Sequence, residues 1–278
     1  MNNRDARKQI AEDTLQILEQ GYYQTPAGTK IDIRTAQYYA EENTLVYRPQ
    51  SSDKLLENST FETCKQPTEI TVTHQTTLDA VRSLISEGHT DVACLNFASA
   101  RNAGGGFLGG SQAQEESIAR ATGLYNCQQQ ANEYYQTNRK IKSCIYTDYM
   151  IYSLTVPIIK DEEGRNLDRL MTCGIITAPA VNAGVVMQRE PHRQKHIEAV
   201  MRRRIRKVLA IALHHGHQSI VLGAWGCGVF QNDPKDIAGY FKEILEGEFH
   251  NKFTKIVFAI YSRNERFITP FQEAFINE

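Results

Sequence analysis

Residues 91–116 read DVACLNFASARNAGGGFLGGSQAQEE, and this stretch decides the fold class. Its first part, DVACLNFA (91–98), is a nearly continuous apolar run, as expected for a strand buried on both faces of a sheet. A glycine-rich turn follows at once, and residues 111–125 are expected to be helical. A buried strand, a turn and a helix form the repeating unit of α/β proteins with parallel sheets.

The same alternation of strand and helix continues along the chain. ITVTH (70–74) is expected to be a strand, and residues 76–88 a helix closed by Gly88. We therefore predict an α/β fold: a three-layer α/β/α sandwich with a mixed, largely parallel sheet. The other expected elements are strands at 149–159, 173–181, 219–222 and 255–262, a charged loop at 160–169, and helices at 190–216 and 264–275.

The N-terminal part of the chain has a different character. Residues 3–20 have the apolar spacing of an amphipathic helix, with Gly21 as its C-terminal cap. Residues 21–70 are rich in Tyr, Thr, Gln and Ser and contain the short extended piece KIDIR (30–34). We expect an accessory region of helix and hairpin over residues 1–67, packed on a core domain over residues 68–278.

Composition and charge exclude several classes of protein. The 278 residues are 41% hydrophobic and 23% charged with a net charge of -1, which is typical of a globular protein and argues against DNA binding by bulk charge. No apolar run could span a bilayer, and the polar N-terminus lacks the apolar core of a secretory signal. The six cysteines form no C-x-x-C pair. We expect a cytoplasmic monomer without membrane contact, metal or cofactor.

The turn after the first buried strand is a candidate anion site. It begins at Asn96, continues through Asn102, and contains Gly104, Gly105 and Gly106 in succession. Consecutive glycines allow several backbone N–H groups to point at one phosphate, although flexible surface loops also use them. The spacing fits neither the dinucleotide-binding pattern nor the P-loop.

A second glycine turn, GAWGCGVF (223–230), supports the same interpretation. It lies between a strand and a helix expected to begin at Pro234 with Asp233 as N-cap, where backbone donors and the helix dipole both favour an anion. Tight strand–helix packing is the alternative explanation. Two such turns in one domain favour a diphosphate held from both sides, with Phe230 packing on a sugar or lying in the core.

Gln114, Glu115 and Glu116 fall at the start of the helix after the first turn. Adjacent helical residues point about 100° apart, so the two glutamates have different roles. Acidic residues in a first turn also simply stabilise the helix dipole. A buried carboxyl near a diphosphate is expected to have a raised pKa, which suits a general acid at neutral pH.

Three other features are expected to be structural. HHGH (214–217) lies at the end of a helix without acids or cysteines at metal-ligand spacing. The arginines of RRRIRK (202–207) are expected on the solvated face of that helix, opposite an apolar stripe. Cys227 has no histidine beside it in sequence, so we interpret it as a small residue in a tight turn rather than a nucleophile.

The G-G-G motif, seven further residues and then Q-E-E resemble the signature of poly(ADP-ribose) glycohydrolases. The resemblance is to the microbial-type branch and covers essentially the whole chain. It includes the NFASARNAGGGFL segment (96–108), the ITAPA strand (176–180) and the GAWGCGVF turn. It implies a macrodomain-like fold with helical additions, no metal or cofactor, and exo-acting hydrolysis of ribose–ribose O-glycosidic bonds in poly(ADP-ribose), with ADP-ribosylated proteins as carriers and ADP-ribose as product.

The resemblance also assigns roles to residues. It implies that Glu116 is catalytic and that Glu115 orients the ribose next to the bond. We hypothesise that a neutral Glu116 protonates the departing oxygen and that its carboxylate then activates water. The expected substrate-binding residues are Asn96, Asn102, Gly104, Gly105, Gly106 and Gln114 from the first segment, and Gly226, Cys227, Gly228, Val229 and Phe230 from the second.

Two other functions stay open from the sequence. A macrodomain-like fold can also serve as an ADP-ribose-binding module without catalysis, or can remove single ADP-ribose units from proteins. The intact Q-E-E favours an enzyme over a pure binding module, and the whole motif favours the polymer as substrate.

Overall fold

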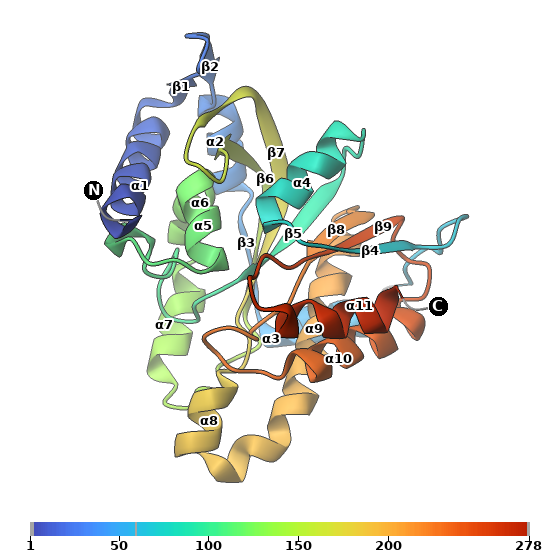
Figure 1. The fold of residues 1–278 in the computed structure, drawn as a ribbon. Coiled ribbons are helices and arrows are strands. Elements are labelled where there is room, and N and C mark those ends of the chain that lie inside the picture. The colour runs from blue at the N-terminus through green and yellow to red at the C-terminus, as the bar shows by residue number, and fades with distance from the viewer. Residues whose placement is uncertain (1–2, 59, 277–278) are drawn as a thin grey trace.

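The computed structural model describes residues 3–58 and 60–276. Seven strands of these residues form one mixed sheet, in the order β3-β6-β7-β5-β8-β9-β4 (Figure 1). The five strands from β7 to β4 are parallel to one another, whereas β6 and β3 add an antiparallel end. The strands are β3 (Leu45–Tyr47), β6 (Met150–Lys160), β7 (Asn166–Ala178), β5 (Val92–Phe97), β8 (Ser219–Leu222), β9 (Lys255–Ala259) and β4 (Glu69–Thr73).

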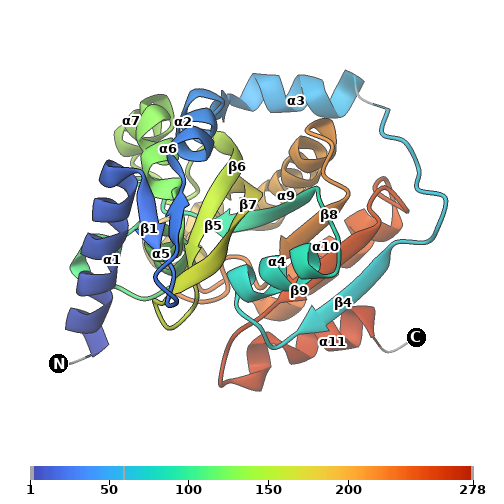
Figure 2. The ribbon, with the colours of Figure 1, turned by 90° about the horizontal axis from the view of Figure 1, so that it is seen from above.

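Helices cover both faces of this sheet, which confirms the predicted three-layer α/β fold (Figure 2). Successive β5 side chains alternate between the two cores, because strand side chains have a period of two. Leu95 packs with α9, α10 and α11, and Cys94 packs with α4, α5 and α6. The helices on the sheet are α4 (Thr77–Ser86), α5 (Gln114–Ala121), α6 (Leu124–Gln130), α7 (Asn132–Lys140), α8 (Ala183–Arg189), α9 (Ile197–His214), α10 (Pro234–Glu246) and α11 (Thr269–Phe275).

The N-terminal region packs against the same body. The predicted first helix is present as α1 (Asn3–Gln20), and Gly21 ends it with a φ of +77°. Ala11 of α1 packs on Phe107 and Ala119, so α1 lies along α5 (Figures 1 and 2). The remaining elements are a hairpin of β1 (Tyr22–Gln24) and β2 (Lys30–Asp32), then α2 (Arg34–Glu42), β3 and α3 (Pro49–Asn58). β3 joins the main sheet through β6, so this region contributes one of its edge strands.

The helix expected over residues 111–125 is two helices, α5 and α6. The chain is extended at Thr122, with φ -139° and ψ 170°, and pairs there with Ile158 of β6. The next residue, Gly123, donates its N–H to the Pro157 carbonyl at 3.0 Å. Tertiary pairing with β6 therefore overrides the helical periodicity at this point.

The charged loop expected over residues 160–169 is much shorter. β6 and β7 form an antiparallel hairpin, and its turn is closed by Asp161, whose N–H donates to the Arg165 carbonyl at 2.9 Å. β7 starts at Asn166 rather than near residue 173, and its first half is exposed. Charged residues fit this strand because it projects beyond the core.

Two long predicted helices also divide into shorter ones. Residues 190–216 contain a 3₁₀ turn (Pro191–His196) before α9, and residues 264–275 contain a 3₁₀ turn (Glu265–Phe267) before α11. Neither 3₁₀ turn has a buried residue, so no apolar stripe extends the helices through them. The N-cap predicted for α10 is confirmed, because the Asp233 side chain accepts the N–H of Lys235.

The expectation that the arginines of residues 202–207 face solvent is wrong for Arg204, which is fully buried, as is Lys207. Arg204 bonds the Asp148 carboxylate at 2.8 Å and the carbonyls of Pro179 and Ile145. These contacts fix the segments around residues 145 and 180, both of which reach the cleft described below. Helix α9 is thus buried over more than its apolar stripe.

Candidate active site

A cleft of about 1400 Å³ opens at the carboxyl ends of the parallel strands. This is where ligands bind in open α/β sheets, because strand ends and helix starts meet there. Eight of the predicted site residues line it, whereas Asn96, the three consecutive glycines and Cys227 do not. The eight are Asn102, Gln114, Glu115, Glu116, Gly226, Gly228, Val229 and Phe230.

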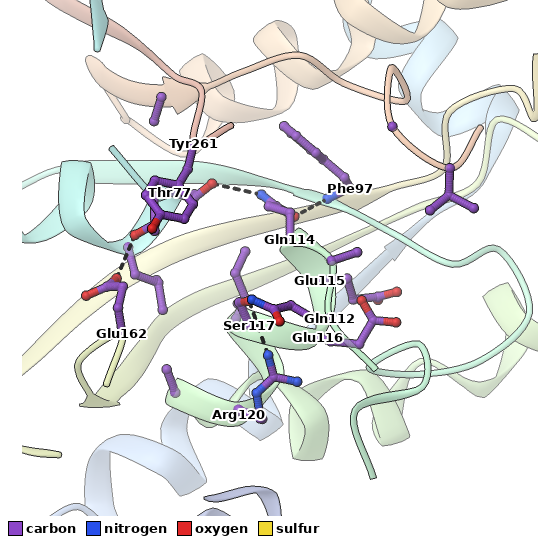
Figure 3. A pocket seen from close by; sticks show the side chains of 18 of the residues that line it. Thr77, Phe97, Gln112, Gln114, Glu115, Glu116, Ser117, Arg120, Glu162 and Tyr261 are labelled. Carbon is purple, nitrogen blue, oxygen red and sulfur yellow. Dashed lines mark hydrogen bonds between the residues drawn. The ribbon is translucent and has the colours of Figure 1, made fainter. Parts of the chain in front are cut away.

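The two glutamates project together from the first turn of α5 (Figure 3). Both carboxyls approach Gly105. A methyl group on that glycine would lie 2.5 Å from Glu116 Oε1 and 3.2 Å from Glu115 Oε2. The missing side chain at Gly105 is therefore what lets the two carboxyls lie side by side.

Glu115 is held rigidly and is only 3% exposed. Its Oε2 accepts the N–H of Ser99 at 2.6 Å, and its Oε1 accepts from Asn96 Nδ2 at 3.3 Å and Gln128 Nε2 at 3.1 Å. Burial raises the pKa of Glu115 to about 8, although these three donors oppose the increase. Burial therefore favours the protonated form of Glu115. From the sequence we expected the buried carboxyl with a raised pKa at Glu116, whereas the structure buries Glu115.

Glu116 is only partly buried, and its carboxyl accepts a hydrogen bond from a single backbone N–H group. Its Oε1 accepts the N–H of Gly106 at 3.0 Å. One carboxyl is thus locked by three donors, while the other has one anchor and lines the cleft. The two neighbouring carboxyls therefore have different surroundings, and their different roles stay a prediction.

The first glycine turn does not present its amides as free donors. Gly104 donates to Gln128 Oε1 at 2.8 Å, Gly105 donates to the Asn102 carbonyl at 3.1 Å, and Gly106 donates to Glu116. Gly104 and Gly105 have φ values of +65° and +59°, which glycine adopts without strain. The glycines shape the turn and admit the carboxyls, so the expectation of several free N–H groups here is not met.

The second glycine turn does present free donors. Among the described residues, no acceptor is found for the N–H groups of Gly226, Gly228, Val229 and Phe230, all of which line the cleft. Gly226 has a φ of +74°, and a methyl group there would lie 2.5 Å from Ala180 Cβ. Consecutive free N–H groups ahead of a helix form an anion site, so this turn is the stronger candidate for a diphosphate.

The remaining predicted residues hold the site together. Gln114 fastens α5 to β5, because its Oε1 accepts the Phe97 N–H at 2.8 Å and its Nε2 donates to Thr77 and the Leu95 carbonyl (Figure 3). Asn96 donates a hydrogen bond from its side-chain amide to Glu115 Oε1. Cys227 is buried, and burial raises the pKa of its thiol, so it is unsuited to act as a nucleophile.

Phe230 lies half-buried at the cleft with its ring centroid 6.1 Å from that of Tyr146. Tyr146 has a φ of +60°, and the Arg101 guanidinium lies 5.7 Å from its ring centroid. The sequence analysis missed Ser99, Gln128 and Tyr146 as site residues. Ser99 lies within the NFASARNAGGGFL segment, but its contact with Glu115 forms only on folding. Gln128 and Tyr146 lie outside every motif, and Gln128 is buried against Glu115 rather than in the cleft lining.

His215 and His217 pack within the protein, whereas His214 is exposed. His215 stacks on Tyr152 at 3.8 Å, and burial lowers its pKa to about 4. His217 bonds the Tyr152 hydroxyl at 2.7 Å. No group of three or more potential metal ligands occurs in residues 3–58 and 60–276.

Comparison with known proteins identifies the family. The sequence model of the microbial-type PARG catalytic domain matches residues 11–161. The chain is 39% identical to the poly(ADP-ribose) glycohydrolase of Thermomonospora curvata, with a TM-score of 0.94, covering 98% of this chain and 100% of that one. The chain belongs to the microbial-type poly(ADP-ribose) glycohydrolase family.

Further members of the family were solved with ligands. The T. curvata glycohydrolase bound to the inhibitor ADP-HPD is 39% identical, with a TM-score of 0.89 and 98% of each chain covered. The Deinococcus radiodurans glycohydrolase in complex with ADP-ribose is 40% identical, with a TM-score of 0.79, covering 86% of this chain and 96% of that one. A search among curated proteins gave no match.

The family assignment confirms the macrodomain-like fold and the enzyme class. The protein is a glycohydrolase that acts on poly(ADP-ribose). Of the helices within residues 3–58 and 60–276, none has the length and apolar character needed to cross a membrane. The cytoplasmic location remains a prediction.

Proposed function

We propose that Glu116 is the acid and base of poly(ADP-ribose) hydrolysis and that Glu115 binds and orients the ribose next to the scissile bond. The arrangement of the two carboxyls at Gly105 supports this division most directly. Glu115 is locked by three N–H donors, so it suits orientation, since a neutral carboxyl both donates to and accepts from a sugar hydroxyl. Glu116 has one anchor and lines the cleft, so it can reach a reacting atom.

The diphosphate is assigned to the second glycine turn. The free N–H groups of Gly226, Gly228, Val229 and Phe230 suit two phosphates. Phe230 with Tyr146 provides an apolar wall for the distal ribose. The first glycine turn contacts the carboxyls of Glu115 and Glu116 and is assigned to the reacting end of the ligand. Gly106 contributes there once its N–H is shared between Glu116 and substrate.

The reaction breaks the bond between C1″ of the terminal unit and the 2′-oxygen of the next unit. Glu116 gives its proton to that oxygen as the bond breaks and an oxocarbenium-like centre develops at C1″. The Glu116 carboxylate then takes a proton from water as the water oxygen bonds to C1″, which returns Glu116 to its starting form. One residue acts in both steps, unlike the two-carboxylate scheme of most glycosidases.

We further propose that the enzyme works from chain ends, releases ADP-ribose, acts as a monomer and does not bind DNA. The preference for chain ends is supported by the N-terminal region, because α1 forms one side of the cleft. Arg7 of α1 donates to the Gly110 carbonyl and to Gln112, and Ile10 also lines the cleft. The β6–β7 turn packs beside it, because a methyl group on Gly164 would lie 2.6 Å from Ile10 Cδ1. This is the role proposed for the accessory residues 1–67.

Labelled poly(ADP-ribose) tests these assignments. Wild-type protein is expected to release free ADP-ribose from the first time point while long chains shorten gradually, whereas early mid-length fragments would exclude exo action. Glu116→Gln is expected to bind polymer and release nothing. A non-catalytic binding module would bind polymer without releasing ADP-ribose in either form. A mono-ADP-ribosyl-protein hydrolase would leave polymer intact and clear single units from proteins.

A further inference from the structure

A second, smaller cavity of about 420 Å³ adjoins the first glycine turn. Asn102 lines both cavities, and its carbonyl accepts the N–H of Gly105, the glycine that the two carboxyls approach. The lining of the second cavity contains no carboxylate. It consists of Asn102, Ala103, Tyr125, Gln128, Gln129, Asn132, Tyr135 and Arg139.

We propose that this cavity, the Tyr135 cavity, is a subsite for the polymer unit on the leaving side of the scissile bond. The inference rests on the proposed function, because it places the next unit of the same polymer beyond the reacting end of the cleft. Its occupant is the ribose of that unit together with the diphosphate that follows it. The chemistry of the lining supports this occupant.

An unused polar group marks the cavity as a binding site. Tyr135 is only 3% exposed, and its hydroxyl has no hydrogen-bond partner among the described residues. Leaving a buried hydroxyl unpaired costs free energy, so a native structure that keeps one usually has a partner for it in another state. A sugar hydroxyl or a phosphate oxygen in the cavity would provide that partner.

The other lining groups match a sugar diphosphate. The amide side chains of Asn102, Gln129 and Asn132 offer donors and acceptors of the kind that sugar hydroxyls need. The exposed Arg139 supplies a positive charge at the mouth. It is held in place because its Nε donates to the Arg101 carbonyl at 2.8 Å, and its guanidinium lies 6.0 Å from the Tyr135 ring centroid. A guanidinium free to pair with a phosphate favours an anionic ligand.

The cavity is also connected to the reacting groups. Gln128 lines it and uses both ends of its amide on the active site, accepting from Gly104 and donating to Glu115. A ligand in the cavity therefore lies against the side chain that holds Glu115. This position explains why a leaving unit bound there would be aligned with the carboxyl pair.

The test compares two substrates that differ only on the leaving side. One is poly(ADP-ribose), and the other is ADP-ribose with a p-nitrophenyl group at C1″, which has no leaving ADP-ribose unit. Tyr135→Phe and Arg139→Gln are expected to lower kcat/KM for the polymer by about 2- to 10-fold each, the range of one lost hydrogen bond. Turnover of the aryl compound and inhibition by ADP-ribose are expected to stay unchanged.

Tyr135→Phe is the sharper variant, because it removes a hydroxyl that makes no protein hydrogen bond and so leaves the fold intact. Lys140→Gln is the matched control, since Lys140 is an exposed neighbouring cation that does not line the cavity. Unchanged polymer kinetics in both cavity variants would overturn the proposal, as would an equal loss on both substrates. A wild-type protein that cleaves neither substrate would instead refute the proposed function.

Discussion

The protonation state of Glu115 makes a quantitative prediction about stability. Its pKa is about 8 in the folded protein, against an ordinary value of 4.5 that the unfolded chain is expected to have. Between these two values the folded state holds a proton that the unfolded state has lost. The stability contribution of this group is therefore complete below pH 4.5 and falls as pH rises towards 8. Each pH unit in this window lowers the free energy of unfolding by roughly 1.4 kcal/mol.

Glu115→Gln removes this dependence, because an amide does not ionise. The variant is expected to be less stable than the wild type at pH 5, since one amide oxygen cannot replace two carboxyl oxygens that accept from Ser99, Asn96 and Gln128. From pH 5 to pH 8 the wild type is expected to lose about 3 kcal/mol of unfolding free energy that the variant keeps.

Urea unfolding of both proteins at several pH values measures this shift, and subtraction cancels the other titrating groups. Glu12→Gln gives the matched control, because Glu12 is exposed on α1 and meets solvent in both states. A gap between wild type and Glu115→Gln that stays constant from pH 5 to pH 8 would refute the assignment of a protonated, buried Glu115.

Three other substitutions probe the site. Gly105→Ala places a methyl group 2.5 Å from Glu116 Oε1, so turnover should fall by about 100-fold or more. Its melting temperature should also fall, because alanine is strained at a φ of +59°. Gly239→Ala in α10, with open space around it, should retain full activity. Gln128→Met leaves Gly104 N–H without its acceptor and should cost about 1–3 kcal/mol by chemical denaturation, with a lower kcat. Arg204→Met removes a buried partner of an acidic group and should cost about 3 kcal/mol, measured in the same way.

Much of the fold could be predicted from the sequence because buried strands and glycine-capped helices are local signals. The apolar run at 91–98 became β5, and Gly21, Gly88 and Gly216 all adopt positive φ beyond helix ends. The positions at which predicted helices divide could not be predicted, because they depend on contacts between residues distant in sequence. The extended conformation at Thr122 depends on pairing with Ile158, which is distant in sequence.

The active site likewise has features that could be predicted from the sequence and features that could not. The carboxyl pair and the two glycine turns could be predicted because each is a contiguous motif. Which glutamate is buried could not, since that depends on Ser99, Asn96 and Gln128 converging on one carboxyl. Which glycine turn keeps its donors free could not either, because Gln128 and Glu116 occupy the amides of the first turn only in the folded chain.

The role of Glu116 is the central claim, and a single-turnover experiment tests it most directly. Glu116→Gln is saturated with labelled poly(ADP-ribose), binding is verified by ADP-ribose competition, and the rate of ADP-ribose release is compared with that of the wild type. The account predicts retained binding and a rate lower by at least about 100- to 10,000-fold, the contribution of a positioned acid–base group. Release within a few-fold of the wild-type rate would contradict it, because another group would then have to protonate the departing oxygen.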